Sequence, residues 1–146
     1  MMTSLNLEER LRPAGSSAAA FEAFTQAVWT QSRIAAPLLE LCRLLIARMH
    51  QADDERSAGK VPVDAAKKAA VLAGDWSDQD LFGAGERAVL DFAELYAIEP
   101  DTITDEAAAA VVAHYGDAGL VTLVEALGVI DGRIRLAMLF NAMEDK

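Results

Sequence analysis

The sequence predicts an all-α protein, built as a single-domain bundle of about six helices. Apolar residues recur at helical spacing along most of the chain, and no segment shows the strict alternation of a half-buried strand. The 146 residues suffice for one domain with a sizeable core, and 53% of them are hydrophobic. We therefore expect residues 1–146 to form one domain in which helices pack against helices.

The helices of the first half are predicted from local signals. Residues 13–17 are Pro-Ala-Gly-Ser-Ser, so we expect an irregular N-terminal lead over residues 1–16. A first helix is expected over residues 17–30 from its apolar spacing. A second should begin at Pro37, a residue that suits the first turn of a helix, and continue to about His50. Residues 51–62 are polar and charged, which favours a loop or a frayed helix end.

The second half contains clearer start and stop signals. A short alanine-rich helix over residues 64–73 should end at the glycine that follows it. Residues 86–97 place their apolar side chains on one stripe, which predicts an amphipathic helix. Thr104 is a suitable N-cap for a helix that ends at Gly116, and a last helix should follow over residues 117–142. Because this last helix is apolar almost all round, we expect it to be the central core helix.

Charge and composition restrict the classes of partner. The net charge is −10, from 23 acidic and 13 basic residues, and such a field repels nucleic acid and anionic membranes. No apolar run reaches transmembrane length without interruption, and the start of the chain lacks a basic region followed by an apolar one. We therefore expect a cytoplasmic protein whose partners are neither nucleic acid nor membrane. The single cysteine, Cys42, excludes an internal disulfide and a two-thiol redox cycle within one chain.

Three polar residues of the predicted second helix share one stripe. Successive residues of a helix turn by about 100°, so Glu40, Arg43 and His50 lie together, opposite an apolar stripe that includes Cys42. A carboxylate, a guanidinium and an imidazole on one face could hold an anionic carboxylic acid and transfer a proton. The same residues also suit a solvated face with an ion pair between Glu40 and Arg43. Cys42, on the apolar side, is expected to be an inert core thiol.

Glu125 interrupts the apolar stretch of the predicted last helix. A buried carboxylate must find a partner or stay protonated. We expect Glu125 to pair with Arg43 or Arg33, or to line the same cavity as Glu40. No spacing of acidic residues and histidines is diagnostic of a metal site, so neither a metal nor another cofactor is expected. On the same helix, the spacing of Asp131 to the arginine four residues later favours an ion pair.

Three segments carry a resemblance to a known family. Residues 38–55 are LLELCRLLIARMHQADDE, and the later segments are GERAVLDFAELYA and ITDEAAAAVVAHYGDAGLVTLVEALGVIDGRIRLAMLF. In the order and spacing of these segments, over roughly residues 37–140, the chain resembles the alkylhydroperoxidase D-like (AhpD-like) and carboxymuconolactone decarboxylase family. The resemblance implies an AhpD-like helical bundle with a family-like core over residues 37–143. It also implies a homo-oligomer.

The redox cysteine pair of that family is absent. The family's usual first segment is similar to E-L-V-R-L-R-x-x-x-x-N-G-C-x-x-C, and here Glu40 and Arg43 match it. Ala52 and Glu55 then fall on the two cysteines. Glu40 matches a glutamate that takes part in proton transfer in the peroxidase branch. Neither Ala52 nor Glu55 can perform thiol chemistry, so thiol peroxidase activity is not expected.

The decarboxylase branch lacks the cysteine pair and has a segment similar to E-L-x-x-H. Glu55 could stand for that glutamate, whereas Gly59 occupies the position of the histidine. The match is half present, so the decarboxylase function is not carried over on this basis. The first functional hypothesis rests instead on the polar stripe of the second helix and is acid–base chemistry, such as decarboxylation or isomerisation, on a small organic acid or lactone. Glu40 and His50 would be its catalytic proton-transfer groups. Further residues would bind the substrate, namely Arg43 as the anion anchor, Glu55 and Glu125.

Two other hypotheses remain open from the sequence. The protein could be a catalytically silent binding or assembly homologue, in which the polar face of the second helix would meet solvent or a filled pocket. Residual peroxidase activity at Cys42 would require a solvent-reachable thiol of low pKa, and the apolar neighbours of this residue argue against that.

Overall fold

The computed structural model describes residues 5–144 and has the all-α fold that the sequence predicts. The first four residues of the predicted lead, and residues 145–146, lie outside this part of the chain. Within it there are seven α-helices and no strand. The α-helices are, in chain order, α1 (Leu7–Leu11), α2 (Ser16–Thr30), α3 (Ala36–Met49), α4 (Asp53–Ser57), α5 (Ala65–Ala73), α6 (Ala84–Ile98) and α7 (Asp105–Glu144). Two short 3-10 helices, η1 (Arg12–Ala14) and η2 (Pro100–Thr102), complete the elements.

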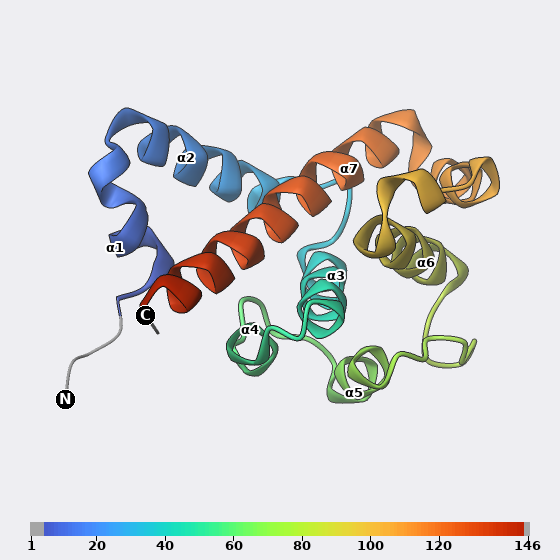
Figure 1. Cartoon of the computed structure of the whole chain (residues 1–146). Coiled ribbons are helices and arrows are strands. Elements are labelled where there is room, and N and C mark those ends of the chain that lie inside the picture. The colour runs from blue at the N-terminus through green and yellow to red at the C-terminus, as the bar shows by residue number, and fades with distance from the viewer. Residues whose placement is uncertain (1–4, 145–146) are drawn as a thin grey trace.

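Helix α7 connects the two ends of the molecule. It runs diagonally across the structure, from α6 at one end to α1 and α2 at the other (Figure 1). Helix α3 lies beneath it, with α4, α5 and α6 around α3 (Figure 1). This arrangement brings the loop after α4, the end of α2 and the middle of α7 together, although they are far apart in the sequence.

The central core helix is α3, so the expectation that the last helix would occupy the core is wrong. Residues 38–47 of α3 are buried without interruption, because α2, α4, α5, α6 and α7 all pack against this helix. Helix α7 instead lies across the bundle with one face that no other element within residues 5–144 covers. Apolar side chains on this face are exposed, among them Val121, Val124, Leu139 and Met143.

The prediction of an irregular lead over residues 1–16 is wrong for the part that the structure describes. The side chain of Asn6 accepts the backbone N–H of Glu9, and the Glu9 carboxylate accepts the N–H of Asn6, so a capping box starts α1. An ion pair between Glu8 and Arg133 then joins α1 to α7. A helix of five residues is too short to show a periodicity, so the sequence pattern did not reveal it.

The other predicted boundaries agree with the structure to within two residues for α2, α3, α5 and α6. Residues 51–62, predicted as a loop or frayed end, contain the short helix α4. Gly116 interrupts α7 as expected, with φ 74° and ψ 175°, a conformation that is essentially restricted to glycine. The break lets the first part of α7 pack beside α6 while the second part crosses the molecule (Figure 1).

Candidate functional site

Glu40 and Arg43 form a buried, bidentate ion pair in the middle of α3. Arg43 Nε lies 2.5 Å from Glu40 Oε1, and Arg43 Nη2 lies 3.2 Å from Glu40 Oε2. Only 1% of Glu40 and 7% of Arg43 is exposed. The ion pair between Glu40 and Arg43 that the sequence suggested is therefore present, but the expectation that it lies on a solvated face is wrong. Buried charges of this kind are stable only when their remaining donors and acceptors are also satisfied.

The remaining polar atoms of the pair hold the chain that follows α4. Arg43 donates to the backbone carbonyls of Glu55, at 2.8 Å, and Ala58, at 2.6 Å. The second oxygen of Glu40 accepts the backbone N–H of Lys60 at 2.7 Å and that of Val61 at 3.4 Å. The pair thus fixes residues 58–61 to α3, and these contacts occupy the groups that the sequence suggested for catalysis.

His50 does not join Glu40 and Arg43 in one pocket. Its Nε2 lies 2.6 Å from Asp131 Oδ1, and the other oxygen of Asp131 accepts a hydrogen bond from Arg135 Nε at 3.1 Å. The predicted pair between Asp131 and Arg135 is therefore present. Burial and the nearby negative charge of Asp131 raise the pKa of Tyr96 above its ordinary value, which places this phenol in the same cluster. His50 thus joins α3 to α7 at a point separate from the Glu40–Arg43 pair.

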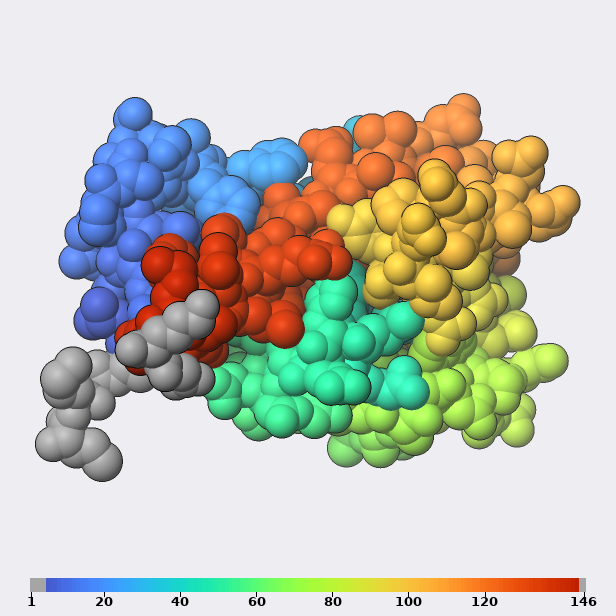
Figure 2. Space-filling model, viewed as in Figure 1, coloured from blue at the N-terminus to red at the C-terminus, as the bar shows by residue number. Residues whose placement is uncertain are grey.

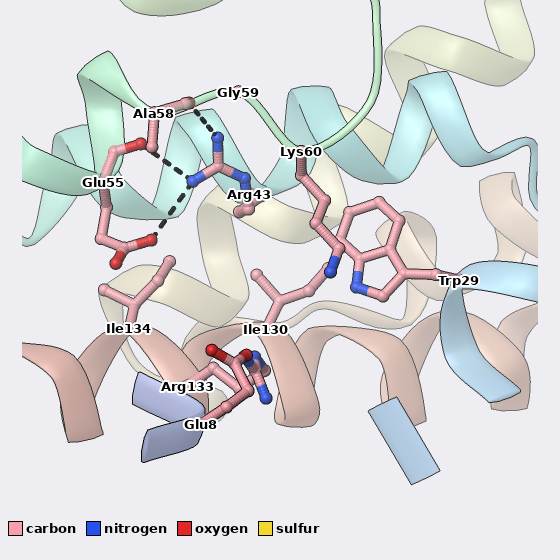
Figure 3. A pocket seen from close by; sticks show the side chains of 10 residues that line it. All are labelled: Glu8, Trp29, Arg43, Glu55, Ala58, Gly59, Lys60, Ile130, Arg133 and Ile134. Atoms are coloured by element: carbon pink, nitrogen blue, oxygen red, sulfur yellow. Dashed lines mark hydrogen bonds and ion pairs between the residues drawn. The ribbon is translucent and has the colours of Figure 1, made fainter. Parts of the chain in front are cut away.

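A pocket of about 200 Å³ lies between the loop after α4, the end of α2 and the middle of α7 (Figure 3). Arg43 and Glu55 are the two predicted site residues that line it. Its complete lining is Glu8, Trp29, Arg43, Glu55, Ala58, Gly59, Lys60, Ile130, Arg133 and Ile134. Glu40 lies on the other side of the loop and lines a separate hollow with Val61, and His50 lines neither of these two.

Cationic side chains outnumber carboxylates at this pocket. The Nζ of Lys60 lies over the ring of Trp29, 5.6 Å from its centroid (Figure 3). Arg133 reaches in from α7 and pairs with Glu8. Arg43 Nη1 lies 3.3 Å from Glu55 Oε2, and 31% of the Glu55 side chain is exposed. Three cations and two carboxylates line the pocket, with an aromatic ring and two isoleucines as the apolar walls. Arg43 is also paired with Glu40, and Arg133 with Glu22, so Lys60 is the cation of the three that forms no ion pair with a carboxylate among the described residues.

Trp29, Lys60 and Arg133 were not identified from the sequence. They come from three distant segments, and no spacing or charge pattern in the sequence links them to one another. Only the tertiary fold brings them together.

Glu125 is exposed on α7 and does not line this pocket, so the expectation that it pairs with Arg43 or Arg33 or shares a cavity with Glu40 is wrong. The uncovered side of α7 leaves this carboxylate in water, where it needs no buried partner.

Two positions of the family's redox motif can be located directly. Ala52, which is buried, immediately precedes α4, and Glu55 lies in the first turn of that helix. No group of three or more His, Cys, Asp or Glu side chains suited to a metal ion occurs within residues 5–144.

Cys42 is fully buried among the apolar residues of α3 and its neighbours. Burial raises the pKa of its thiol from 9.0 to about 12, because the thiolate would lose its hydration. A thiol of this kind neither attacks a peroxide nor forms a disulfide at neutral pH.

Comparisons with known proteins do not assign a family. No protein-family model matches the chain, and no curated protein has a significant similarity to it.

We predict that Cys42 is unreactive in the folded protein. At pH 8, an aromatic disulfide reagent should show no measurable reaction over minutes, whereas the unfolded chain should react completely. The raised pKa also predicts that stability falls as the pH rises from 9 towards 12, because only the unfolded chain then releases the thiol proton. A Cys42→Ala variant is the control and should lack the reaction in denaturant. Stoichiometric labelling of the native protein within seconds would contradict this prediction.

We also predict that Glu40→Gln lowers the free energy of unfolding by about 3–5 kcal/mol, because it leaves the Arg43 charge buried without its partner. Urea denaturation followed by circular dichroism measures this change. Glu99→Gln, at an exposed position, is the matched control and should change it by less than about 0.5 kcal/mol. The double variant Glu40→Leu, Arg43→Met should lose less than the sum of its two single changes. Equal effects of Glu40→Gln and Glu99→Gln would be inconsistent with a structural role for the pair.

Proposed function

We propose that this protein binds a small organic carboxylate in the pocket beside Trp29, with Lys60 and Arg133 as the anion-binding side chains. We also propose that it is a relative of the AhpD-like family without the redox cysteine pair, one that retains a small-molecule pocket without peroxidase chemistry. The observation that carries the binding proposal is Lys60 at an apolar, partly enclosed pocket, where its ammonium lies over the Trp29 ring and takes part in none of the ion pairs found within residues 5–144.

The size and chemistry of the pocket support a small anion. A volume of about 200 Å³ is below the range of drug-sized sites and suits a compact acid. Lys60 presents a compact charge at one wall and Arg133 a guanidinium at the other, so a carboxylate could receive hydrogen bonds from both. The ring of Trp29 and the side chains of Ile130 and Ile134 would contact the hydrocarbon part of the same ligand.

Absence of the thiol pair supports the second part of the proposal. Ala52 and Glu55 occupy the positions that carry cysteines in the family, and Cys42 is buried with a pKa raised to about 12. The two positions at which the family has cysteines that react with peroxide therefore carry side chains that cannot undergo this reaction.

A second candidate function is acid–base catalysis, namely decarboxylation or isomerisation, on the same ligand. Glu55 favours it, because its carboxylate lines the pocket, is 31% exposed and lies 3.3 Å from Arg43. Chromatography of a bound acid or lactone after incubation distinguishes the two functions. Conversion that Glu55→Gln abolishes while binding persists supports catalysis, and recovery of the unchanged ligand supports binding alone.

We predict that a small carboxylate raises the melting temperature by about 5–10 °C at 100 times its Kd, whereas its uncharged amide does not. Thermal unfolding identifies the ligand from a panel of mono- and dicarboxylates and their lactones, and calorimetry then measures its Kd. Lys60→Met should weaken binding by about tenfold or more, because a charge-assisted hydrogen bond contributes roughly 1.5–3 kcal/mol.

Lys68→Met is the matched control, because this lysine lies on α5 outside the pocket lining and its loss should leave the Kd unchanged. Equal stabilisation by the acid and the amide, or equal Kd values for Lys60→Met and the unaltered protein, would refute the proposed anion site.

A further inference from the structure

One face of α7 is apolar and is not covered by any other element between residues 5 and 144. Its large side chains are widely exposed, at 58% for Val121, 47% for Val124, 55% for Leu139 and 58% for Met143. Atoms of the second part of α7 lie on the surface of the molecule, between α1 and α2 on one side and α3 and α6 on the other (Figure 2). The face extends over roughly 33 Å of helix, at about 1.5 Å per residue. An apolar face of this length is typical of a contact with another protein surface.

The middle of this face allows another helix to approach closely. Gly128 and Gly132 lie one turn apart, and a Cβ built on either would meet nothing within 4 Å. The face therefore has a shallow depression at its centre, between larger side chains at both ends. A backbone can approach such a position without steric conflict.

The charges on this face are arranged symmetrically about its centre. Glu125 lies three residues before Gly128, and Arg135 lies three residues after Gly132. Both charged residues are exposed, and 64% of the Arg135 side chain is accessible. One end of the face is thus acidic and the other basic, at equal distances from position 130.

This arrangement is complementary to itself in one orientation. If two α7 helices pair antiparallel about position 130, Glu125 of each copy meets Arg135 of the other. The same register places Gly128 opposite Gly132, and Val121 opposite Leu139. Two-fold symmetry forms each of these contacts twice. A parallel pairing in register would instead place like charges together.

We propose that α7 forms an antiparallel, two-fold symmetric contact with α7 of a second copy of this chain. This contact would be the interface of a homo-oligomer. It does not depend on the proposed ligand. By length and composition alone α7 is also apolar enough to cross a membrane, with a mean hydropathy of 1.4 over its most apolar window. Glu125 and Arg135 are costly to place in lipid, although Arg135 also bonds to Asp131, whereas a second copy pairs each of them with an opposite charge.

Sedimentation equilibrium of the full chain tests the contact, and we expect a dimer or a larger even-numbered assembly. Glu125→Arg should weaken association by about tenfold or more, because it places two pairs of like charges in each contact. Arg135→Glu should weaken it as well, and the double variant should recover most of the loss. Phe24→Ala, which removes an exposed apolar side chain from α2, is the control and should leave association unchanged.

Cysteine cross-linking tests the register in a Cys42→Ala background. Val121→Cys and Leu139→Cys proteins should form a mixed disulfide dimer when combined, and each alone should form several-fold less. A monomer at tens of micromolar would overturn the proposal, as would an assembly that Glu125→Arg leaves intact. Faster cross-linking of either single variant with itself would also overturn it. So would a monomer that binds phosphatidylcholine vesicles through this face.

Discussion

The buried ion pair between Glu40 and Arg43 is the contact on which the candidate site depends. Moving both charges out of water costs several kcal/mol per ion, and the bidentate geometry alone does not offset this cost. Backbone groups of residues 55–61 offset the remainder by satisfying the free atoms of the pair. The same bonds fix the loop, so the position of Lys60 at the pocket follows from a polar contact inside α3. The sequence suggested Glu40 and Arg43 as residues that contact a substrate. In the structure they instead hold in place the loop that carries Lys60 to the pocket.

Helix positions could be predicted because their signals are local. Pro37 and Gly74 each act within one turn of their own helix, and the structure uses them as the sequence suggests. The failures concern features that depend on distant residues. The capping box of α1 starts a helix of only five residues, and the ion pair of Glu8 with Arg133 on α7 is what joins this helix to the rest of the protein. Whether α3 or α7 is the buried helix depends on which of them the other helices surround. Apolar composition was similar for both helices and could not distinguish them.

The candidate site was less predictable than the fold. Arg43 and Glu55 were found because the motif that carries the resemblance includes both, and both line the pocket. Periodicity correctly placed Glu40 beside Arg43, but it could not show that backbone amides would cover them. Lys60 and Trp29 share no segment and no pattern. The expectation for Glu125 failed because it assumed that an apolar helix is buried on every side.

That failure also explains the unusual composition of α7. One side carries Ile130 and Ile134, which line the pocket, and the opposite side carries Gly128, Gly132 and the exposed apolar residues. A helix needs apolar residues on both sides only if both sides are covered, and the elements within residues 5–144 leave one side of α7 uncovered. A second copy on the other side would account for the whole pattern, including a glutamate and an arginine placed at equal distances from its centre. Ligand and partner would then occupy opposite faces of a single helix. If binding on one face shifts α7, the shift changes the binding free energy on the other face. By thermodynamic linkage, each binding event then changes the free energy of the other by the same amount.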